Sequence, residues 1–161
     1  MKNFVIVGAA GFIAPRHMKA IKETNNNLVA AMDPSDNVGI LDTYFPNAEF
    51  FTDFSRLDRY LSKLRLEKTK IDFITICTPN FLHDFYIRYA LKNNINAICE
   101  KPLVINPKNL EEINYLEKKS NKKIYTILQL RNHPNILKLR NEIKNKKKIR
   151  CRVNLYNVTR K

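Results

Sequence analysis

The first strand-like run of the chain constrains its fold most strongly. Residues 4–7 form an apolar run with two valines and an isoleucine, which predicts a buried β-strand. Gly8 and Gly11 follow directly, and from Ala14 onward apolar residues recur at helical spacing. The chain has only three glycines, so two in one turn indicate a close backbone approach there. A strand, a glycine turn and a helix form half of a dinucleotide-binding unit, where a pyrophosphate rests on the free N–H groups of the helix.

The spacing of this turn, G-x-x-G-x-x-A, leaves a second interpretation open. It differs by one residue from the commoner G-x-G-x-x-G, and a glycine turn can also serve only to pack a helix on a strand. A carboxylate favours the nucleotide: Asp33 ends the next apolar run, about 22 residues after Gly11, where a ribose-binding acid belongs. Asp33 would accept bonds from ribose hydroxyls and repel a 2′-phosphate, which predicts NAD(H) over NADP(H). Its alternative is a turn residue at a strand end, because residues 33–37 are also favourable for a turn.

Length and composition predict one soluble domain. A chain of 161 residues with 44% hydrophobic residues can bury a real core. No apolar run approaches the roughly 18 residues that span a bilayer, and the first run is too short for a signal peptide. We therefore expect a cytoplasmic protein with no membrane partner. The three cysteines lack paired metal spacing, so Cys77 and Cys99 are expected to be buried reduced thiols and no metal site is predicted.

A net charge of +14 and a pI near 9.8 are typical of proteins that bind nucleic acids. The lysines are scattered over helix faces and cluster only at Lys144 and residues 146–148. This pattern predicts a solvated surface that binds polyanions loosely rather than a specific nucleic-acid reader. An anionic substrate such as a nucleotide sugar would also be attracted to it.

Strand-like and helix-like segments alternate along the chain. Such alternation predicts an α/β fold, a Rossmann-type doubly wound parallel sheet with helices on both faces. Further strands are expected at 27–33, 49–51, 71–77, 97–99 and 124–128, and helices at 13–24, 38–45, 55–66, 82–93, 109–119 and 136–144.

The last segment has a different pattern. Residues 150–159 alternate polar and apolar residues, as in a half-exposed strand of an antiparallel sheet. Such a strand has no partner in the rest of the sequence. We expect a nucleotide-binding domain over 1–147 and, over 148–161, the first strand of a missing second α/β domain. Its open edge could pair with a partner chain or a second copy.

Three segments carry polar side chains directly after predicted buried strands. Because the carboxyl ends of parallel strands share one edge of a sheet, these segments should lie on the same rim as the glycine turn. The candidate residues are Thr78, Asn80 and His83 in the first segment, Glu100 and Lys101 in the second, and Gln129, Arg131 and His133 in the third.

Each segment also has a purely structural interpretation. Asn80 could cap the next helix and leave His83 an ordinary surface histidine. Lys101, followed by a proline, could direct its ammonium at a cofactor or substrate, or belong to a surface turn. Arg131 and His133 could contact a phosphate or sugar, or the segment could introduce a helix at the following proline.

Together, these features resemble the N-terminal domain of the Gfo/Idh/MocA oxidoreductases. The glycine turn, Asp33, residues 78–83 and the tripeptide Glu100-Lys101-Pro102 follow in the order of that family, over essentially the whole chain. Within the family, residues 8–17, 76–80 and 128–131 are most similar to the bacterial UDP-N-acetylglucosaminuronate 3-dehydrogenases of lipopolysaccharide O-antigen synthesis.

The resemblance implies a role for each candidate. The pyrophosphate loop would comprise Gly8, Gly11, Phe12, Ile13 and Ala14, and Asp33 would hold the ribose. Further cofactor-binding residues would be Thr78, Asn80, His83, Glu100 and Gln129. Lys101 would lie beside the nicotinamide ribose and help polarise the reacting hydroxyl, and Arg131 and His133 would contact the substrate. The reaction would be oxidation of a sugar C3 hydroxyl in a UDP-N-acetylhexosaminuronate, with hydride passing to NAD⁺.

Two alternatives remain at this point. Family enzymes are about twice as long, and their second domain supplies most of the sugar site and usually an acid/base histidine. The chain is therefore expected to be truncated and incomplete as a catalyst, so that a non-catalytic NAD-binding module or a decayed fragment is one alternative. The other is an extended short-chain epimerase or dehydratase, which needs a Tyr-x-x-x-Lys pair; Tyr115 and Lys119 have that spacing on a polar helix.

Overall fold

The computed structural model describes residues 1–144, which fall into two compact units divided after Ile127. Unit 1 covers residues 1–127 and unit 2 begins at Leu128, and each is described by itself. The predicted domain boundary at 147 and the predicted strand over 150–159 lie outside the described residues and stay predictions.

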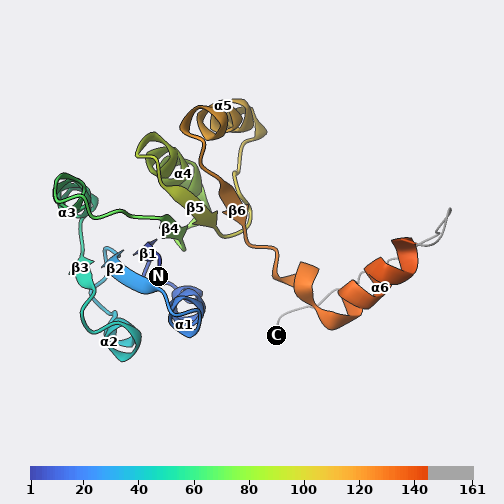
Figure 1. Cartoon of the computed structure of the whole chain (residues 1–161), viewed down its shortest axis with the longest axis horizontal. Helices are drawn as coiled ribbons and strands as arrows, with labels where there is room; N and C mark the ends of the chain where they lie inside the picture. Colours follow the sequence, from blue (N-terminus) through green and yellow to red (C-terminus); the bar gives the residue numbers. More distant parts are fainter. Residues whose placement is uncertain (145–161) are drawn as a thin grey trace. The chain divides into compact units, whose positions relative to one another are not determined.

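Unit 1 is built on a sheet of six parallel strands in the order β3-β2-β1-β4-β5-β6 (Figure 1). This order confirms the predicted Rossmann-type doubly wound sheet. The strands are β1 Asn3–Val7, β2 Asn27–Met32, β3 Glu49–Phe51, β4 Phe73–Ile76, β5 Asn96–Cys99 and β6 Ile124–Thr126.

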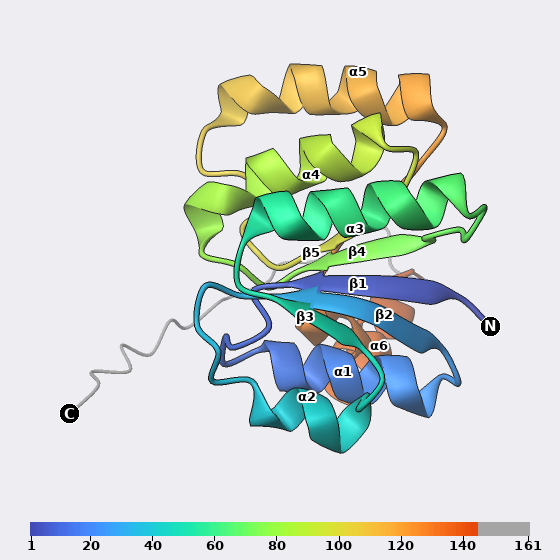
Figure 2. The same cartoon turned by 90° about the vertical axis from the view of Figure 1, so that its left-hand side faces the viewer.

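Helices cover both faces of this sheet. Figure 2 shows α1 and α2 beneath the sheet and α3, α4 and α5 above it. Their bounds are α1 Ala14–Glu23, α2 Gly39–Tyr44, α3 Phe54–Leu66, α4 His83–Lys92 and α5 Leu110–Ser120, with short 3₁₀ turns η1 Asn80–Leu82 and η2 Pro107–Asn109. These ends lie within two residues of the predicted ones, because the apolar spacing and the turn residues are both strong signals.

Two apolar cores form, one on each face of the sheet. On the face of α3, α4 and α5, Leu57, Leu61 and Leu64 of α3 are buried together against the strands, as their spacing predicts. On the other face, Met18 of α1 and Leu41 of α2 pack against the strands. Burying one such side chain stabilises the fold by about 1.5–3 kcal/mol.

The order of the strands reverses at β1, which lies between β2 and β4. The chain leaves β1 toward α1 on one face and leaves β4 toward α4 on the other face. The two connections therefore diverge at the carboxyl ends of these strands, and an open parallel sheet binds its ligands in the crevice between them.

Unit 2 contains η3 Gln129–Asn132 and α6 Pro134–Lys144. The helix begins at the proline, as one of the two interpretations of this segment predicts. Among the described residues, no helix is both long enough and apolar enough to cross a membrane.

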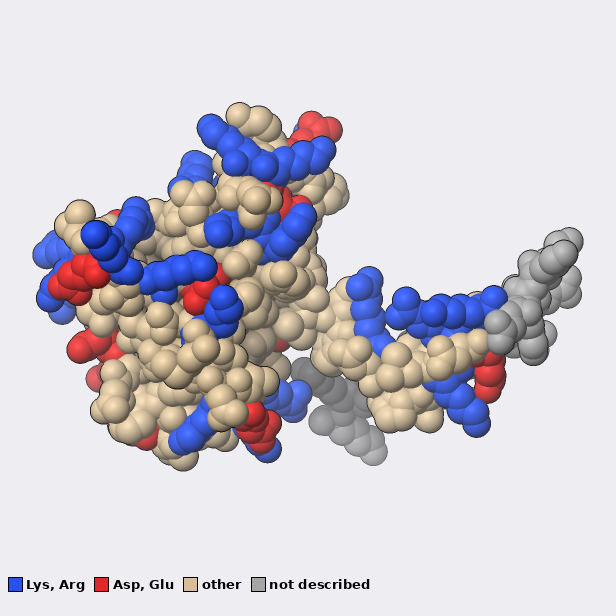
Figure 3. All heavy atoms as spheres, in the orientation of Figure 1, with Lys and Arg blue, Asp and Glu red and all other residues tan. Residues whose placement is uncertain are grey.

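Basic side chains are spread over the face of unit 1 that Figure 3 shows, with acidic side chains among them. They do not gather into one patch on that face. This distribution agrees with the predicted solvated surface rather than with a dedicated nucleic-acid interface.

Candidate functional site

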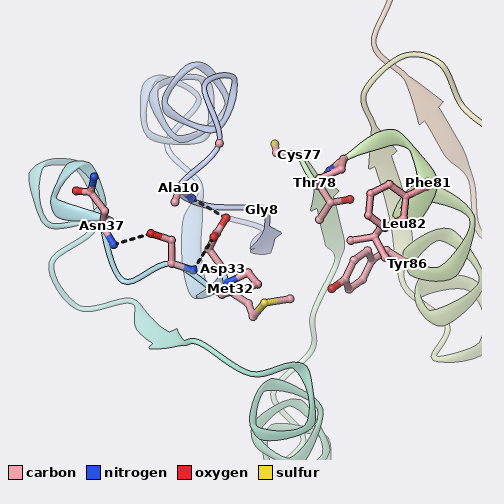
Figure 4. A pocket seen from close by; sticks show the side chains of 14 residues that line it. Gly8, Ala10, Met32, Asp33, Asn37, Cys77, Thr78, Phe81, Leu82 and Tyr86 are labelled. Carbon is pink, nitrogen blue, oxygen red and sulfur yellow. Dashed lines mark hydrogen bonds between the residues drawn. The ribbon is translucent and has the colours of Figure 1, made fainter.

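A cavity of about 590 Å³ lies at the carboxyl ends of β1, β2 and β4 (Figure 4). Its walls come from the glycine turn, from the end of β2 and the loop after it (residues 32–35 and Asn37), from the loop after β4 and from the first turns of η1 and α4. Cavities of this size hold small ligands and cofactors. The cavity lies at the crevice where the strand order reverses, which is where the sheet topology predicts a ligand site.

The glycine turn needs glycine at Gly8 for reasons internal to the fold. Gly8 has φ +83°, and a Cβ there would lie 2.6 Å from the backbone of Cys77 and Thr78. At Gly11, a Cβ would lie 3.1 Å from the carbonyl oxygen of Gly8. The predicted close approach exists, but at Gly8 it is an approach to the chain's own β4 loop.

The amides of the turn divide into bonded and free groups. Gly8 and Ala9 donate to the carbonyl of Met32, and Gly11 donates to the carbonyl of Gly8. Phe12 and Ile13, which immediately precede α1, find no backbone or side-chain acceptor within residues 1–144. Two free N–H groups at a helix start form a suitable anion site.

Asp33 is fixed at the edge of the cavity by two backbone amides. Its Oδ2 accepts a hydrogen bond from the Ala10 amide at 3.0 Å and its Oδ1 accepts one from the Ser35 amide at 2.9 Å. Each carboxylate oxygen keeps a second lone pair for a ligand. The strand-end turn and the ligand role are thus compatible, since the turn orients the carboxylate toward the cavity (Figure 4).

Thr78 brings a free hydroxyl to the same cavity. The residue is 9% exposed and lines the cavity, and its Oγ1 has no hydrogen-bond partner within the described part of the chain. A buried hydroxyl without a partner costs about 1–3 kcal/mol. A ligand with a polar group at this point would remove that cost, so the site fits a cofactor with hydroxyls for Asp33 and a hydroxyl or phosphate for Thr78.

Neither Asn80 nor His83 has the purely structural role that the sequence offered for it, a helix cap for Asn80 and a surface position for His83. Asn80 begins η1, and neither η1 nor α4 has a side-chain cap, so the capping interpretation of Asn80 is wrong. His83 is 0% exposed rather than a surface residue, with Nδ1 2.7 Å from the Pro102 carbonyl and Nε2 3.0 Å from the Thr78 carbonyl. It joins the loop after β4 to the loop after β5 and is not among the residues that line the cavity, and its role toward a cofactor stays a prediction.

The loop after β5 carries Glu100 and Lys101. Glu100 Oε1 lies 2.9 Å from Nε2 of His17, and both side chains are 13% exposed. Lys101 is exposed and is the next residue along the chain. The partner of Glu100 was not predicted, because His17 lies within a predicted helix and belongs to none of the segments that follow a strand.

Two further residues at this site were also missed. Tyr86 of α4 lines the cavity and is 5% exposed, although its spacing in the sequence suggests only a core position. Cys77 lines the cavity too, while Cys99 is buried on the neighbouring strand. Burial raises the pKa of both thiols, and the charge of Glu100 raises both pKa values further. The pKa of Cys99 reaches about 12. The prediction of buried reduced thiols is confirmed for both.

The remaining predicted residues belong to unit 2. Gln129 and Arg131 lie in η3, and His133 precedes α6 and accepts the Asn135 amide on Nδ1 at 3.3 Å. All three are exposed within that unit. Their roles toward a cofactor or substrate stay predictions.

The pair that would mark a short-chain epimerase lies elsewhere. Tyr115 on α5 is 60% exposed, and Lys119 stacks on its ring at 5.8 Å. Neither residue lines the cavity at the strand ends. Among residues 1–144 there is also no cluster of histidine, cysteine and acidic residues that could hold a metal ion.

The chain is similar in sequence and in fold to known oxidoreductases. Residues 2–128 match a family model described as the GFO_IDH_MocA oxidoreductase family, NAD-binding Rossmann fold. The chain is 44% identical to the WlbA (WbpB) dehydrogenase of Thermus thermophilus, solved with NAD and alpha-ketoglutarate and with NAD and UDP-GlcNAcA, at a TM-score of 0.88. The match covers 92% of this chain and 48% of that one, so the chain spans about half the length of these relatives.

A more distant structure shares the fold alone. The myo-inositol 2-dehydrogenase of Lactobacillus plantarum is 20% identical, with a TM-score of 0.74, over 89% of this chain and 41% of that one.

Proposed function

The chain belongs to the Gfo/Idh/MocA family of NAD-binding oxidoreductases, and we propose that it holds NAD for the oxidation of a nucleotide sugar. The observation that carries the proposal is Asp33, a carboxylate held at the edge of the cavity by the Ala10 and Ser35 amides. A carboxylate at the end of the second strand of this fold accepts hydrogen bonds from the adenosine ribose. Its charge disfavours a 2′-phosphate, so NAD is the preferred dinucleotide.

The rest of the cofactor would be held by backbone and hydroxyl groups. Phe12 and Ile13, whose amides find no acceptor among the described residues, suit the pyrophosphate, at a turn shaped by Gly8, Gly11 and Ala14. Thr78 offers a hydroxyl that has no partner within residues 1–144, and Asn80 lies two residues further on, on the exposed rim. His83 supports this loop from behind through its two carbonyl contacts.

The reacting end would lie at the loop after β5. Bound NAD⁺ would supply the hydride acceptor: the hydrogen on the sugar C3 would leave with its electron pair to the nicotinamide, and the C3 hydroxyl would lose its proton to become a ketone. Lys101 would polarise that hydroxyl, since an ammonium stabilises the developing negative charge on oxygen. Glu100 would contact the cofactor, and Gln129, Arg131 and His133 would contact cofactor or substrate.

The substrate class rests on the relatives and on charge. The Thermus thermophilus WlbA dehydrogenase was solved with UDP-GlcNAcA, at 44% identity over 92% of this chain. The net charge of +14 suits a substrate with a diphosphate and a carboxylate. We therefore propose a UDP-N-acetylhexosaminuronate of lipopolysaccharide synthesis as the substrate.

Calorimetric titration of NADH and NADPH into the 161-residue chain tests the cofactor part. We expect NADH to bind and NADPH to bind at least about tenfold more weakly, because the repulsion of unit charges near 4 Å costs about 1 kcal/mol in bulk water and about 4 kcal/mol near a protein surface, and about 1.4 kcal/mol is tenfold. A folded chain that binds neither dinucleotide would overturn the proposal.

The activity is tested separately, by incubating the chain with NAD⁺ and UDP-GlcNAcA and following NADH absorbance. Formation of NADH supports the dehydrogenase. Binding of NADH without turnover supports the alternative, an NAD-binding module that needs a further domain or chain for catalysis.

A further inference from the structure

Tyr86 presents a fixed aromatic ring to the cavity. It lies on α4 and is only 5% exposed, and Phe54 at the start of α3 contacts its ring edge-on, with centroids 5.6 Å apart. Phe85 contacts the ring in a second edge-on pair at 5.0 Å. These contacts restrict the rotation of the ring, and the packing of α3 against α4 determines where it lies in the cavity wall.

The hydroxyl of this tyrosine has no hydrogen-bond partner within residues 1–144. One turn further along α4, Tyr89 provides a contrast, since its hydroxyl donates to Asp58 Oδ1 at 2.5 Å. The side chain of Tyr86 lines the cavity instead, so its hydroxyl is available to a ligand there. In Figure 4 the hydroxyl end of Tyr86 points from α4 into the space that Asp33 borders on the other side.

The electrostatic surroundings agree with this placement. Burial raises the pKa of Tyr86, and the Asp33 carboxylate raises it further. The hydroxyl therefore keeps its proton at neutral pH and can both donate and accept a hydrogen bond. Met32 and Leu82 add apolar surface to the same cavity.

These features suit one part of the proposed cofactor. The adenosine half of NAD joins a flat base, with polar atoms on its edge, to a ribose that Asp33 would hold. We infer that the Tyr86 hydroxyl hydrogen-bonds the adenosine half of NAD, opposite Asp33. This inference rests on the proposed function and adds a recognition residue outside the glycine turn and the strand-end acid.

The test compares Tyr86→Phe with the matched variant Tyr89→Phe. Calorimetry with NADH and with ADP-ribose is expected to show about 3- to 10-fold weaker binding for Tyr86→Phe, the net value of one hydrogen bond. Tyr89→Phe should bind both ligands as the wild type does, because its hydroxyl bonds Asp58 outside the cavity.

Thermal unfolding without ligand separates recognition from folding. Tyr86→Phe removes only an unpartnered hydroxyl, so its midpoint should equal or exceed that of the wild type. Tyr89→Phe should unfold at a lower temperature. Wild-type affinity in Tyr86→Phe, with the wild type binding NADH, would overturn this inference and leave the proposed function intact. A wild type that binds neither ligand would overturn both.

Discussion

Nε2 of His17 lies 2.9 Å from Oε1 of Glu100, and this contact joins α1 to the loop after β5. The helix begins directly after Phe12 and Ile13 of the glycine turn, and Glu100 immediately precedes Lys101. The pair therefore links the segment proposed to hold the pyrophosphate with the segment proposed to act on the substrate.

Removing His17 should loosen this link. We expect His17→Ala and Glu100→Ala each to lower the free energy of unfolding, with a coupling energy of about 1 kcal/mol or more, because both side chains are largely buried. Urea unfolding of the wild type, both single variants and the double variant measures it. Additive losses would show that the two side chains do not interact.

The charge of Asp33 should set the choice of dinucleotide. Asp33→Asn keeps an acceptor for the Ala10 amide but removes the negative charge. The ratio of NADH to NADPH affinity is expected to fall about tenfold or more, since the repulsion of a 2′-phosphate is lost. Titration of both dinucleotides measures the ratio, and Asp36→Asn, a change at an exposed residue after β2, is the control. An unchanged ratio in Asp33→Asn would argue against the ribose role.

Gly8 should tolerate no side chain. Gly8→Ala places a Cβ 2.6 Å from the backbone of Cys77 and imposes φ +83° on an L-residue, so we expect a loss of more than about 2 kcal/mol. Gly39 offers the matched control, because a Cβ there meets nothing within 4 Å. Gly39→Ala should leave stability unchanged or raise it by up to about 1 kcal/mol. Equal stabilities of the two variants in urea would contradict this account.

Asp72 should make stability depend on pH in the acid range. Burial alone would raise the pKa of this carboxyl, but the Asn3 amide, Lys70 and Lys2 together lower it below its ordinary value. A carboxyl with a lowered pKa in the folded state stabilises the fold above its unfolded-state pKa, and this contribution is lost as pH falls through its folded-state pKa.

We therefore expect the free energy of unfolding to fall as pH drops below about 4, near the ordinary pKa of the group. Asp72→Asn should be less stable than the wild type by about 1 kcal/mol at neutral pH and should show a shallower acid slope. Urea unfolding across the acid range measures both, with Asp36→Asn as the exposed control. Parallel slopes in the wild type and Asp72→Asn would rule out this role.

Cys77 should react slowly and be protected by cofactor. Its pKa is raised by burial, by Glu100 and by Cys99, and the thiolate is the reactive form. Alkylation followed by peptide mass spectrometry should be slow at neutral pH and accelerate in urea. NADH should slow it further, because Cys77 lines the cavity. Fast labelling of the folded chain, unaffected by NADH, would contradict the proposed site.

The order and the ends of the strands and helices were largely predictable, because the sequence patterns that determine them are local. Apolar runs, helical spacing and turn residues placed each end within two residues, and strict alternation of strand and helix implied the parallel sheet. Asp33 and the glycine turn were predictable for the same reason, since their spacing along the chain reflects one connection between adjacent strands.

The contacts that organise the site were not predictable in this way. His17 and Glu100 are 83 residues apart in the chain, and only the sheet order brings their two loops together. His83 has the sequence context of a helix start, yet packing buried it completely between two loop carbonyls. Tyr86 lies at a helix position whose spacing in the sequence indicates a core residue. Only the folded structure shows that its side chain also lines the cavity beside β4.

The sequence alone was thus sufficient for the strand and helix order, the parallel sheet, the glycine turn and the acid that follows β2, because hydrophobic periodicity and backbone conformation act over a few residues. The tertiary structure decided which polar groups are paired, buried or left free at the crevice. Those outcomes depend on distances between loops remote in the chain, which are determined only when both cores are packed against the sheet.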